Sequence, residues 1–312
     1  MSQPKSSPKS KPKSLKRLRP SLAVIGSGRL GQALAVALAS SGYRVVALVA
    51  RTPSHARRAA ELVGSTRKPV PAFGAGQLND LPNSDLILIS TPDDVIESVA
   101  TTLAGSLASS AGSRTVLHTS GALASDVLNP LAELGLHTGS LHPLVSINEA
   151  QTGAKALRGA FYCLEGDTQA LRMARLIVKD LEGKSFSIEP ESKPLYHAAA
   201  VMASGHMVAL FDLATKMLVS CGLKHTIARQ ILMPLVASAM NNLKAGNPAK
   251  ALTGTFARGD LETVGRHLKA LSREELSTAL AVYKLLGVRS IELAEKNKIN
   301  QQQLEQIKKL LL

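Results

Sequence analysis

The segment that most constrains this chain is residues 22–34, where a short apolar run leads through three spaced glycines into a second apolar run. Gly26, Gly28 and Gly31 have the spacing G-x-G-x-x-G, and the flanking runs have the composition of a buried strand and of an apolar helix. In this setting the first glycine permits a tight turn, the second lets backbone approach a pyrophosphate, and the third lets helix and strand pack closely. The free N–H groups at the start of the helix then face the phosphates. We therefore predict a dinucleotide site, rather than a merely glycine-rich turn, formed by Gly26, Ser27, Gly28, Arg29, Leu30 and Gly31.

The end of the next predicted strand, residues 43–50, indicates which dinucleotide binds. A chain that binds NAD usually carries Asp or Glu there, about 20 residues after the glycines, to hold the ribose 2′-hydroxyl. Here the strand runs into Arg51, and the first carboxylate is Glu61. A guanidinium binds phosphate through two parallel hydrogen bonds. We therefore predict NADP in preference to NAD, with Arg51, Thr52 and Ser54 around the 2′-phosphate; the alternative is that Arg51 is a solvated loop residue.

Composition places the chain among globular proteins of about two domains. Of its 312 residues 45% are hydrophobic and 19% are charged, aromatic residues make up 3%, and Trp is absent, so we expect an aliphatic core. Cys163 and Cys221 lie far apart in apolar surroundings and indicate no disulfide framework. A reducing cytoplasm is therefore the expected compartment.

Half of the net charge of +14 lies in residues 1–20, which hold seven Lys and Arg residues and no acidic one. Their Ser and Pro content predicts a disordered basic tail. No aromatic residue is interleaved for base stacking, so we do not expect a nucleic-acid partner. The apolar run after the tail is interrupted by Gly26 to Arg29 and by Gln32, which disfavours a signal peptide. No other stretch reads as a membrane span, and we expect a soluble protein.

Beyond the glycine turn the sequence alternates between strand and helix patterns, which predicts a doubly wound parallel α/β sheet over residues 21–189. Continuous apolar runs such as residues 85–90 are typical of strands that helices cover on both faces. The predicted strands after the first are 43–50, 70–73, 85–90, 115–118, 136–141, 160–164 and 185–188, and the predicted helices after the first are 54–63, 91–107, 123–134 and 168–181.

From residue 190 the pattern becomes helical throughout, and we predict a second, all-α domain over residues 190–312. Its expected helices are 195–219, 223–243, 261–271, 273–286, 288–296 and 300–311. The helix 195–219 is apolar on nearly every side, as in a helix buried between others. So apolar a helix is hard to bury within one small domain, and we therefore expect a homodimer built through this domain.

Polar residues lie at the carboxyl ends of three predicted strands, which is where open α/β sheets bind their ligands. These residues are Ser90, Thr91, Pro92, His118, Ser120 and His142. Two histidines beside hydroxyls at neighbouring strand ends favour one of them facing the nicotinamide, and the alternative for each is a structural, hydrogen-bonded histidine. We predict the first four residues in the cofactor site, Ser120 at the substrate and His142 in catalysis.

The first helix of the second domain carries a polar stripe on an otherwise apolar surface. At about 100° per residue, Lys193, His197 and Ser204 share one side, whereas His206 lies opposite and is expected to pack. Such polar groups need partners, and a substrate crevice between domains supplies them. Lys or His against a carbonyl or imine can donate the proton that accompanies hydride transfer. We predict His197 first and Lys193 second as the proton donor, with Ser204 at the substrate; the alternative for Lys193 is a solvated residue at the helix start.

The loop of residues 252–260 places Thr253, Arg258 and Asp260 among glycines. Arg258 can clamp a substrate carboxylate through two hydrogen bonds, with Thr253 beside it. The alternative is an Arg258–Asp260 pair in which Asp260 caps the following helix. No H-x-x-x-H or C-x-x-C spacing is present, so no metal site is predicted. The chain also lacks G-x-S-x-G, which disfavours a serine hydrolase of that type.

Four further segments carry a resemblance to a known family: residues 118–123, 139–144, 193–200 and 251–260. Together with the glycine turn they span residues 22–285. The chain resembles the oxidoreductases of the pyrroline-5-carboxylate reductase and 6-phosphogluconate dehydrogenase group, and more closely the dehydrogenase-like family that carries the domain of unknown function DUF2520. The resemblance implies a Rossmann-like domain followed by an all-α domain of the 6-phosphogluconate dehydrogenase C-terminal type. It also implies a nicotinamide cofactor, and a dimer in which the 251–260 loop approaches the partner's crevice.

Two positions depart from many relatives, which carry Asn where this chain has Gly205 and Pro where it has Thr255. If that Asn contacts substrate in relatives, this chain lacks the contact. The sequence thus predicts an NADPH-dependent reductase or dehydrogenase acting on a small carbonyl, hydroxy acid or cyclic imine, in which the protein binds and orients while the cofactor supplies the hydride. The alternative is an NADP-binding sensor or scaffold without turnover, since a fold does not establish activity.

Overall fold

The computed structural model describes residues 19–64, 69–108, 113–297 and 300–312. The chain divides into two compact units, and the division falls between Val201 and Met202. Most of the predicted basic tail therefore lies outside the described residues. Helices replace strands from about residue 190, but the division lies later than the predicted boundary between residues 189 and 190. The first helix, α7 (Lys193–Ala203), contacts the sheet of the first unit through hydrogen bonds of Lys193 and Tyr196.

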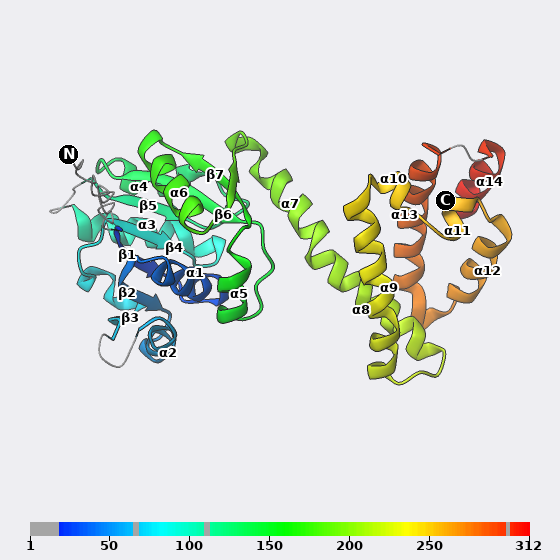
Figure 1. Ribbon diagram of the computed structural model, residues 1–312, viewed down its shortest axis with the longest axis horizontal. Coiled ribbons are helices and arrows are strands. Elements are labelled where there is room, and N and C mark those ends of the chain that lie inside the picture. The colour runs from blue at the N-terminus through cyan, green and yellow to red at the C-terminus, as the bar shows by residue number, and fades with distance from the viewer. Residues whose placement is uncertain (1–18, 65–68, 109–112, 298–299) are drawn as a thin grey trace, which may run out of the picture. The chain divides into compact units, whose positions relative to one another are not determined.

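The described part of the first unit is built on one eight-stranded sheet in the order β3-β2-β1-β4-β5-β6-β7-β8 (Figure 1). The strands are β1 Ser21–Ile25, β2 Arg44–Ala50, β3 Ala72–Gly74, β4 Leu86–Ile89, β5 Thr115–His118, β6 His137–Pro143, β7 Phe161–Gly166 and β8 Lys184–Phe186. All neighbours pair in parallel except β6 and β7, which are antiparallel. The predicted doubly wound α/β fold is confirmed, and the prediction that every strand is parallel is wrong for this one pair.

The reversal at β7 has a simple cause in the connection that precedes it. Between β6 and β7 the chain forms one short helix, α5 (Ala150–Ala156), which the sequence pattern did not predict. Parallel neighbours need a crossover that carries the chain back to the opposite end of the sheet. Here the chain instead returns beside β6 from the end at which it left, and Pro143 pairs with Tyr162.

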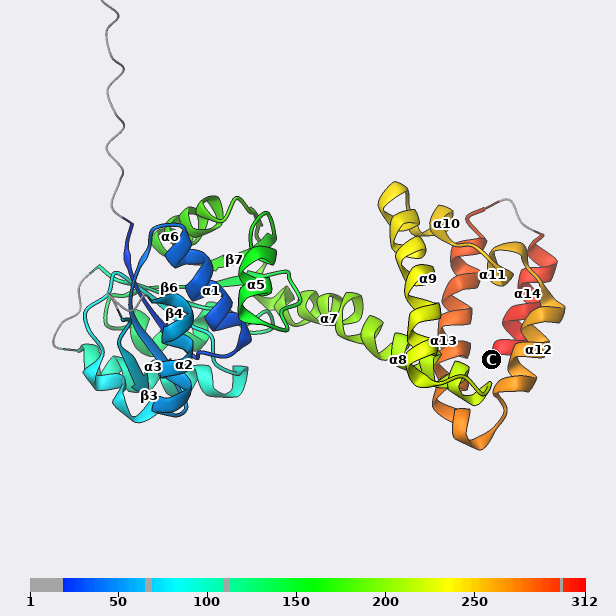
Figure 2. The ribbon, with the colours of Figure 1, turned by 60° about the horizontal axis from the view of Figure 1, so that its bottom comes forward.

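Helices cover both faces of the sheet, and alternation along each strand decides which side chain meets which helix. Leu22 and Val24 of β1 pack into a core shared with α1, α5 and α6, whereas Ala23 and Ile25 pack into a second core with α3 and the segment around Leu131. Figures 1 and 2 show these helices on the two sides of the strands. The helices are α1 Arg29–Ser40, α2 Pro53–Val63, α3 Asp93–Leu107, α4 Asn129–Ala132 and α6 Thr168–Asp180. Both faces are apolar, which explains the continuous apolar runs in the sequence.

The helix predicted for residues 123–134 is shorter and divided. A 3₁₀ turn occupies Ser125–Leu128, and α4 begins only at Asn129. Pro130 stands in the first turn of α4, and because proline lacks an N–H group the helical hydrogen bonds restart there. The sequence pattern gave the right region but missed this break.

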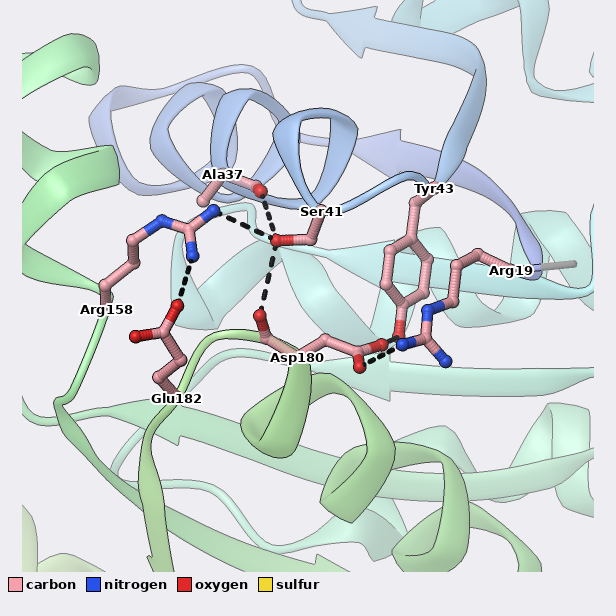
Figure 3. Close-up of polar contacts among 7 residues, drawn as sticks. All are labelled: Arg19, Ala37, Ser41, Tyr43, Arg158, Asp180 and Glu182. Atoms are coloured by element: carbon pink, nitrogen blue, oxygen red, sulfur yellow. Dashed lines mark hydrogen bonds and ion pairs between the residues drawn. The ribbon is translucent and has the colours of Figure 1, made fainter. Parts of the chain in front are cut away.

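A polar network ties the first strand to the ends of two helices, at the amino ends of the strands (Figure 3). The Asp180 carboxylate accepts hydrogen bonds from Arg19 at 2.6 Å and from the Tyr43 hydroxyl at 2.9 Å. Arg158 donates to the Ser41 hydroxyl at 3.3 Å and so joins the end of α1 to the same network. Burial first, and then the bond to Asp180, raise the pKa of Tyr43, so its hydroxyl remains a donor. These bonds fix α1 against α6 and leave the carboxyl ends of the strands free for a site.

The described part of the second unit is helical. Its helices are α8 Gly205–Ser220, α9 His225–Ala245, α10 Pro248–Ala251, α11 Thr255–Arg258, α12 Leu261–Leu271, α13 Ser277–Ala294 and α14 Gln301–Leu311. Val264, Ile291 and Leu304 join α12, α13 and α14 in one core. The helices predicted separately at 273–286 and 288–296 form the single helix α13, because Gly287 packs directly against Leu311 and neither proline nor a capping residue stops the helix.

The apolar helix predicted for residues 195–219 is two helices, α7 and α8, because Ser204 leaves the helical conformation with φ −123° and ψ −73°. Much of its apolar surface is exposed in the single chain, with Leu195 77% and Val208 65% exposed, in line with the expectation that one small domain cannot bury so apolar a helix. Exposed apolar side chains continue along α8 and α9 and include Met207, Leu210, Ile231, Met233 and Leu235.

One helical run, Pro190–Ser220, is long and apolar enough to cross a membrane by length and composition, so the expectation that no such stretch exists is wrong on that criterion. A single run of this kind is weak support for a span. Two features of the run argue against a membrane span. The helix breaks at Ser204, and the Lys193 side chain near its start is buried in the first unit.

Candidate functional site

The glycine turn after β1 is held by contacts that leave no room for side chains. Gly26 has φ +98°, and a Cβ placed on it would lie 2.5 Å from the carbonyl group of Ser90. A Cβ on Gly31 would lie 2.0 Å from the carbonyl oxygen of Gly26. The N–H groups of Gly26 and Ser27 both donate to the carbonyl of Val49, at 3.0 and 2.9 Å. The turn is thus packed against the carboxyl ends of β2 and β4, and these two glycines are required by the protein itself.

Gly28 is different, because packing does not require it. A Cβ at this position would meet no atom of the described residues within 4 Å, so the space beside it is open. Gly28 precedes α1, whose first internal hydrogen bond runs from Gln32 N–H to the Gly28 carbonyl at 2.9 Å. The N–H groups of Arg29, Leu30 and Gly31 come before that bond and are free to bind an anion. The predicted pyrophosphate cradle therefore has the open space and the donors that a diphosphate needs.

The residues predicted for the 2′-phosphate gather where β2 ends and α2 begins. Thr52 caps α2, with its hydroxyl accepting from His55 N–H at 3.4 Å and lying 3.1 Å from the hydroxyl of Ser54. Arg51, Thr52 and Ser54 are exposed, and within the described residues Arg51 forms no ion pair. The segment adjoins the glycine turn, since Ser27 donates through its hydroxyl to the Val49 carbonyl at 2.9 Å.

The residues that follow β4 also border the region around the glycine turn. Ser90 N–H donates to the Ile25 carbonyl at 2.7 Å, and the Ser90 hydroxyl accepts from Thr119 at 3.2 Å. The Thr91 hydroxyl is buried and has no hydrogen-bond partner among the described residues. A buried hydroxyl without a partner is costly, and a bound ligand is one way to satisfy it. Pro92 follows and precedes α3.

The side chains of His118 and Ser120 both form hydrogen bonds at the turn that follows β5. The fully buried His118 ring contacts the Ala124 carbonyl through Nε2 at 3.1 Å and accepts from Ser120 N–H on Nδ1 at 3.2 Å, which fixes a neutral ring with its proton on Nε2. Burial first, then the charge of Lys193, lower the pKa of His118 to about 3. The Ser120 hydroxyl donates to Asp93 at 2.9 Å. A contact of His118 with the cofactor and one of Ser120 with the substrate stay predictions.

The antiparallel pair β6 and β7 creates a polar surface beside this turn. Ser140 pairs with Glu165 and His142 with Cys163, and because strand side chains alternate, all four belong to one face. The helix α7 packs on that face with Lys193, Tyr196 and His197. Their i, i+3 and i+4 spacing places these three side chains on one side of the helix.

Lys193 is fully buried, which excludes the alternative of a solvated residue at the helix start. Its ammonium group donates to the Ser140 hydroxyl at 2.7 Å and to the Ser120 carbonyl at 3.4 Å. The Ser140 hydroxyl in turn donates to Glu165 at 3.4 Å. Burial lowers the pKa of Lys193, and the nearby charge of Glu165 opposes that shift. Lys193 is therefore tied to the sheet through Ser140.

His142 and His197 lie against each other at Gly121. Their ring centroids are 5.6 Å apart at an angle of 78°. A Cβ on Gly121 would lie 2.5 Å from His197 Nδ1 and 2.8 Å from His142 Nε2, so this glycine lets both rings approach the turn. His197 Nδ1 is buried without a partner among the described residues. Burial first, then His197 and Lys193, lower the pKa of His142 to about 4, which keeps it neutral near pH 7.

Sequence reasoning missed Tyr196, Glu165 and Cys163. The Tyr196 hydroxyl lies 2.6 Å from His142 Nδ1 and so belongs to the site. Its position three residues after Lys193, on the helix that carries the predicted proton donors, was a usable signal. Glu165 and Cys163 left no such signal, because only the antiparallel register brings them beside Ser140 and His142.

The remaining predicted residues belong to the second unit. Ser204 is exposed at the break between α7 and α8, so the helical spacing from Lys193 does not extend to it. Thr253 and Arg258 are exposed on either side of Gly254, which has φ +83°. Asp260 caps α12, accepting from Thr263 N–H at 3.0 Å, which confirms the predicted cap, whereas among the described residues no ion pair joins it to Arg258.

No cluster of three His, Cys, Asp or Glu side chains that could hold a metal ion occurs in the part of the chain that the structure describes. Cys163 is buried and Cys221 exposed, and both are free thiols. The candidate site therefore consists of the glycine turn, the ends of β2 and β4, and the cluster of Lys193, His142, His197 and Tyr196.

Comparisons with known proteins agree with this architecture. Residues 1–143 match the family described as Rossmann-like domain, and residues 160–290 match the domain of unknown function DUF2520. No protein with a curated description matches the sequence. Among solved structures, protein TM1727 from Thermotoga maritima is 24% identical, with a TM-score of 0.66 over 89% of this chain and 99% of that chain.

Two further solved structures share the fold. A Bacteroides fragilis protein, BF3122, named as an NADP oxidoreductase, is 21% identical with a TM-score of 0.70 over 89% of this chain and 98% of that chain. The Plasmodium falciparum pyrroline carboxylate reductase with NADP bound is 12% identical with a TM-score of 0.55 over 95% of this chain and 99% of that chain. At these identities the likeness shows the fold.

The two neutral histidines predict a loss of stability in mild acid. The pKa values of His142 and His118 fall from 6.5 in the unfolded chain to about 4 and about 3 in the folded protein. Below 6.5 the unfolded chain therefore binds more protons, and the free energy of unfolding decreases as the pH falls toward 4. Urea unfolding between about pH 7 and about pH 5 measures this slope. We expect a smaller slope in His142→Asn, and equal slopes would contradict the assignment.

Proposed function

We propose that this chain, a Rossmann-like protein that carries a DUF2520 domain, is an oxidoreductase that binds NADP and transfers a hydride to or from a small substrate. The observation that carries the proposal is the contrast within the glycine turn. Gly26 and Gly31 are fixed by packing, whereas Gly28 borders open space at the start of α1. That arrangement suits a diphosphate bound to the free N–H groups of Arg29, Leu30 and Gly31.

NADP in preference to NAD is supported by the end of β2. Arg51 follows the strand where a carboxylate would hold the 2′-hydroxyl of NAD, and the exposed hydroxyls of Thr52 and Ser54 lie 3.1 Å apart beside it. A guanidinium and two hydroxyls at a helix start suit a 2′-phosphate. The fold is also that of a reductase from Plasmodium falciparum whose structure has NADP bound.

The substrate class we propose is a small carbonyl, hydroxy acid or cyclic imine. When bound, the cofactor supplies the hydride chemistry. We propose that the proton that accompanies the hydride comes from the cluster beside Gly121. Lys193 is enclosed by Ser140 and Ser120, so it acts on its neighbours through its charge, while the rings of His142 and His197 lie at the edge formed by Gly121. Ser120, Ser204, Thr253 and Arg258 remain the residues proposed to bind substrate.

We further propose a cytoplasmic homodimer built through the helical unit. The exposed apolar side chains on α8 and α9, such as Val208 and Leu235 at 65% and 66%, would be covered by a second copy. Both cysteines are free, which suits a reducing compartment. Sedimentation of the full chain as a monomer at micromolar concentration would contradict this state.

Gly28→Ala tests cofactor binding without disturbing the fold. The added methyl group enters open space, on backbone with φ −73° and ψ −170° that alanine adopts readily. We expect calorimetry to show that affinity for NADPH and NADH falls about tenfold or more, because the methyl group occupies the phosphate's place, while Tm is unchanged. Gly105→Ala is the matched control, since its Cβ also meets nothing within 4 Å but lies on α3. Unchanged affinity in Gly28→Ala would refute the proposed cradle.

Turnover completes that test and separates an enzyme from a sensor. The full chain with NADPH, assayed against carbonyl and cyclic-imine compounds, should oxidise NADPH with at least one of them, and Gly28→Ala should lose this rate. Tight NADPH binding with no turnover across the panel would instead favour the non-catalytic sensor or scaffold.

Arg51→Ala tests the choice of cofactor. Removing a charged hydrogen bond to the 2′-phosphate should lower NADPH affinity by about 10- to 100-fold. NADH has no 2′-phosphate, so its affinity should change by less than about twofold and serves as the internal control. Equal weakening of both cofactors would count against the 2′-phosphate role.

A further inference from the structure

His142 lies between Cys163 and Tyr196, and these neighbours bear on which of its ring nitrogens carries the proton. On β7 its cross-strand partner is Cys163, and on α7 the hydroxyl of Tyr196 lies 2.6 Å from its Nδ1. The tyrosine ring is held edge-on to His142, with centroids 5.5 Å apart, and edge-on to Phe186, at 5.9 Å. The hydroxyl therefore has a defined position beside Nδ1.

The direction of the hydrogen bond between Tyr196 and His142 follows from which of the neighbouring groups carry a proton near pH 7. Burial, and then the neighbouring Cys163, raise the pKa of Tyr196, so its hydroxyl keeps its proton near pH 7. The Tyr196 hydroxyl also hydrogen-bonds the Cys163 thiol. Burial raises the pKa of Cys163, so it stays a neutral thiol, and a thiol is by nature a weak donor and a weak acceptor. The imidazole nitrogen is the better acceptor of the two. Tyr196 therefore donates to His142 Nδ1.

A neutral imidazole carries a single N–H group, and this settles the state of the other nitrogen. Burial and the charges of His197 and Lys193 keep His142 neutral near pH 7. With Nδ1 accepting, the proton of His142 is on Nε2. That nitrogen lies 2.8 Å from where a Cβ of Gly121 would stand, and among the described residues no hydrogen bond to it is formed.

We propose that Tyr196 is a positioning residue that holds His142 in the Nε2–H tautomer and so presents a free hydrogen-bond donor at Gly121. The substrate atom that can accept this hydrogen bond is a carbonyl oxygen or an imine nitrogen. Negative charge develops on that atom as the hydride arrives, and the N–H group of a neutral imidazole can stabilise this charge or donate the proton. Among the predicted proton donors this favours His142 over Lys193, whose donors are directed at Ser140 and Ser120. The role at the substrate rests on the proposed function, whereas the tautomer does not.

Side-chain ¹⁵N NMR of histidine in the full chain near pH 7 reads the tautomer directly and needs no substrate. The signals of His142 are identified by their loss in His142→Asn. In the wild type we expect Nδ1 at the unprotonated position and Nε2 at the protonated one. In Tyr196→Phe the donor is lost, and we expect the Nδ1 signal to shift toward the protonated position as the two tautomers mix.

The chain offers a matched control in its second Tyr–His pair. The Tyr283 hydroxyl lies 2.8 Å from His267 Nδ1, with the rings edge-on at 5.8 Å. Tyr283→Phe should shift His267 and leave His142 unchanged.

A wild-type spectrum with the proton on Nδ1 of His142 would overturn the proposal, and this result can be read even if Tyr196→Phe does not fold. Unchanged His142 signals in a folded Tyr196→Phe would also overturn it. Where a substrate is known, Tyr196→Phe should lower kcat with little change in KM, and an unchanged kcat would reject the catalytic role alone. Failure of cofactor binding would refute the proposed function and leave the NMR result standing.

Discussion

The close approach of three strand ends at the glycine turn is the constraint on which the rest of the first unit depends. Gly26 contacts the backbone of Ser90 and donates, with Ser27, to Val49, so β1, β2 and β4 meet within one turn. Any Cβ at Gly26 or Gly31 would collide with backbone, and backbone cannot rotate away as a side chain can. The first N–H groups of α1, which as in any helix lack an intrahelical partner, follow directly after Gly28. The anion site that we propose thus borders a turn that backbone packing holds in place.

The antiparallel strand β7 has a comparable role at the other side of the sheet. By running beside β6 it places Glu165 opposite Ser140 and Cys163 opposite His142, and this polar face receives Lys193 of α7. A buried ammonium group is stable only with partners, and the Ser140 hydroxyl and the carboxylate of Glu165 behind it provide them. The positive charge held there adds to burial in keeping the neighbouring histidines neutral. The Lys193 ammonium group, held by Ser140, therefore contributes, after burial, to the lowered pKa of both histidines.

The parts of the fold that could be predicted are those that local patterns specify. The G-x-G-x-x-G spacing located the turn, continuous apolar runs located the covered strands, and helical spacing placed Lys193 and His197 on one side of α7. The register of β7 could not be predicted from the sequence, because it depends on a short connection and on tertiary pairing. For the same reason Glu165 and Cys163 could not be assigned to the site. The surface that covers α8 could not be predicted either, because an all-round apolar helix indicates burial without showing which surface buries it. The break at Ser204 did have a local signal, the Ser204–Gly205 pair, which the long apolar pattern on either side outweighed.

The two halves of the candidate site are joined by hydrogen bonds within one sheet. Thr119 after β5 donates to Ser90 after β4, and Ser120 is bonded both to Asp93 of α3 and to Lys193 of α7. The glycine turn and the cluster around Gly121 are therefore linked by hydrogen bonds within the first unit. The activity that we propose requires a proton source held in place relative to the cofactor, and this continuous set of hydrogen bonds is suited to that requirement.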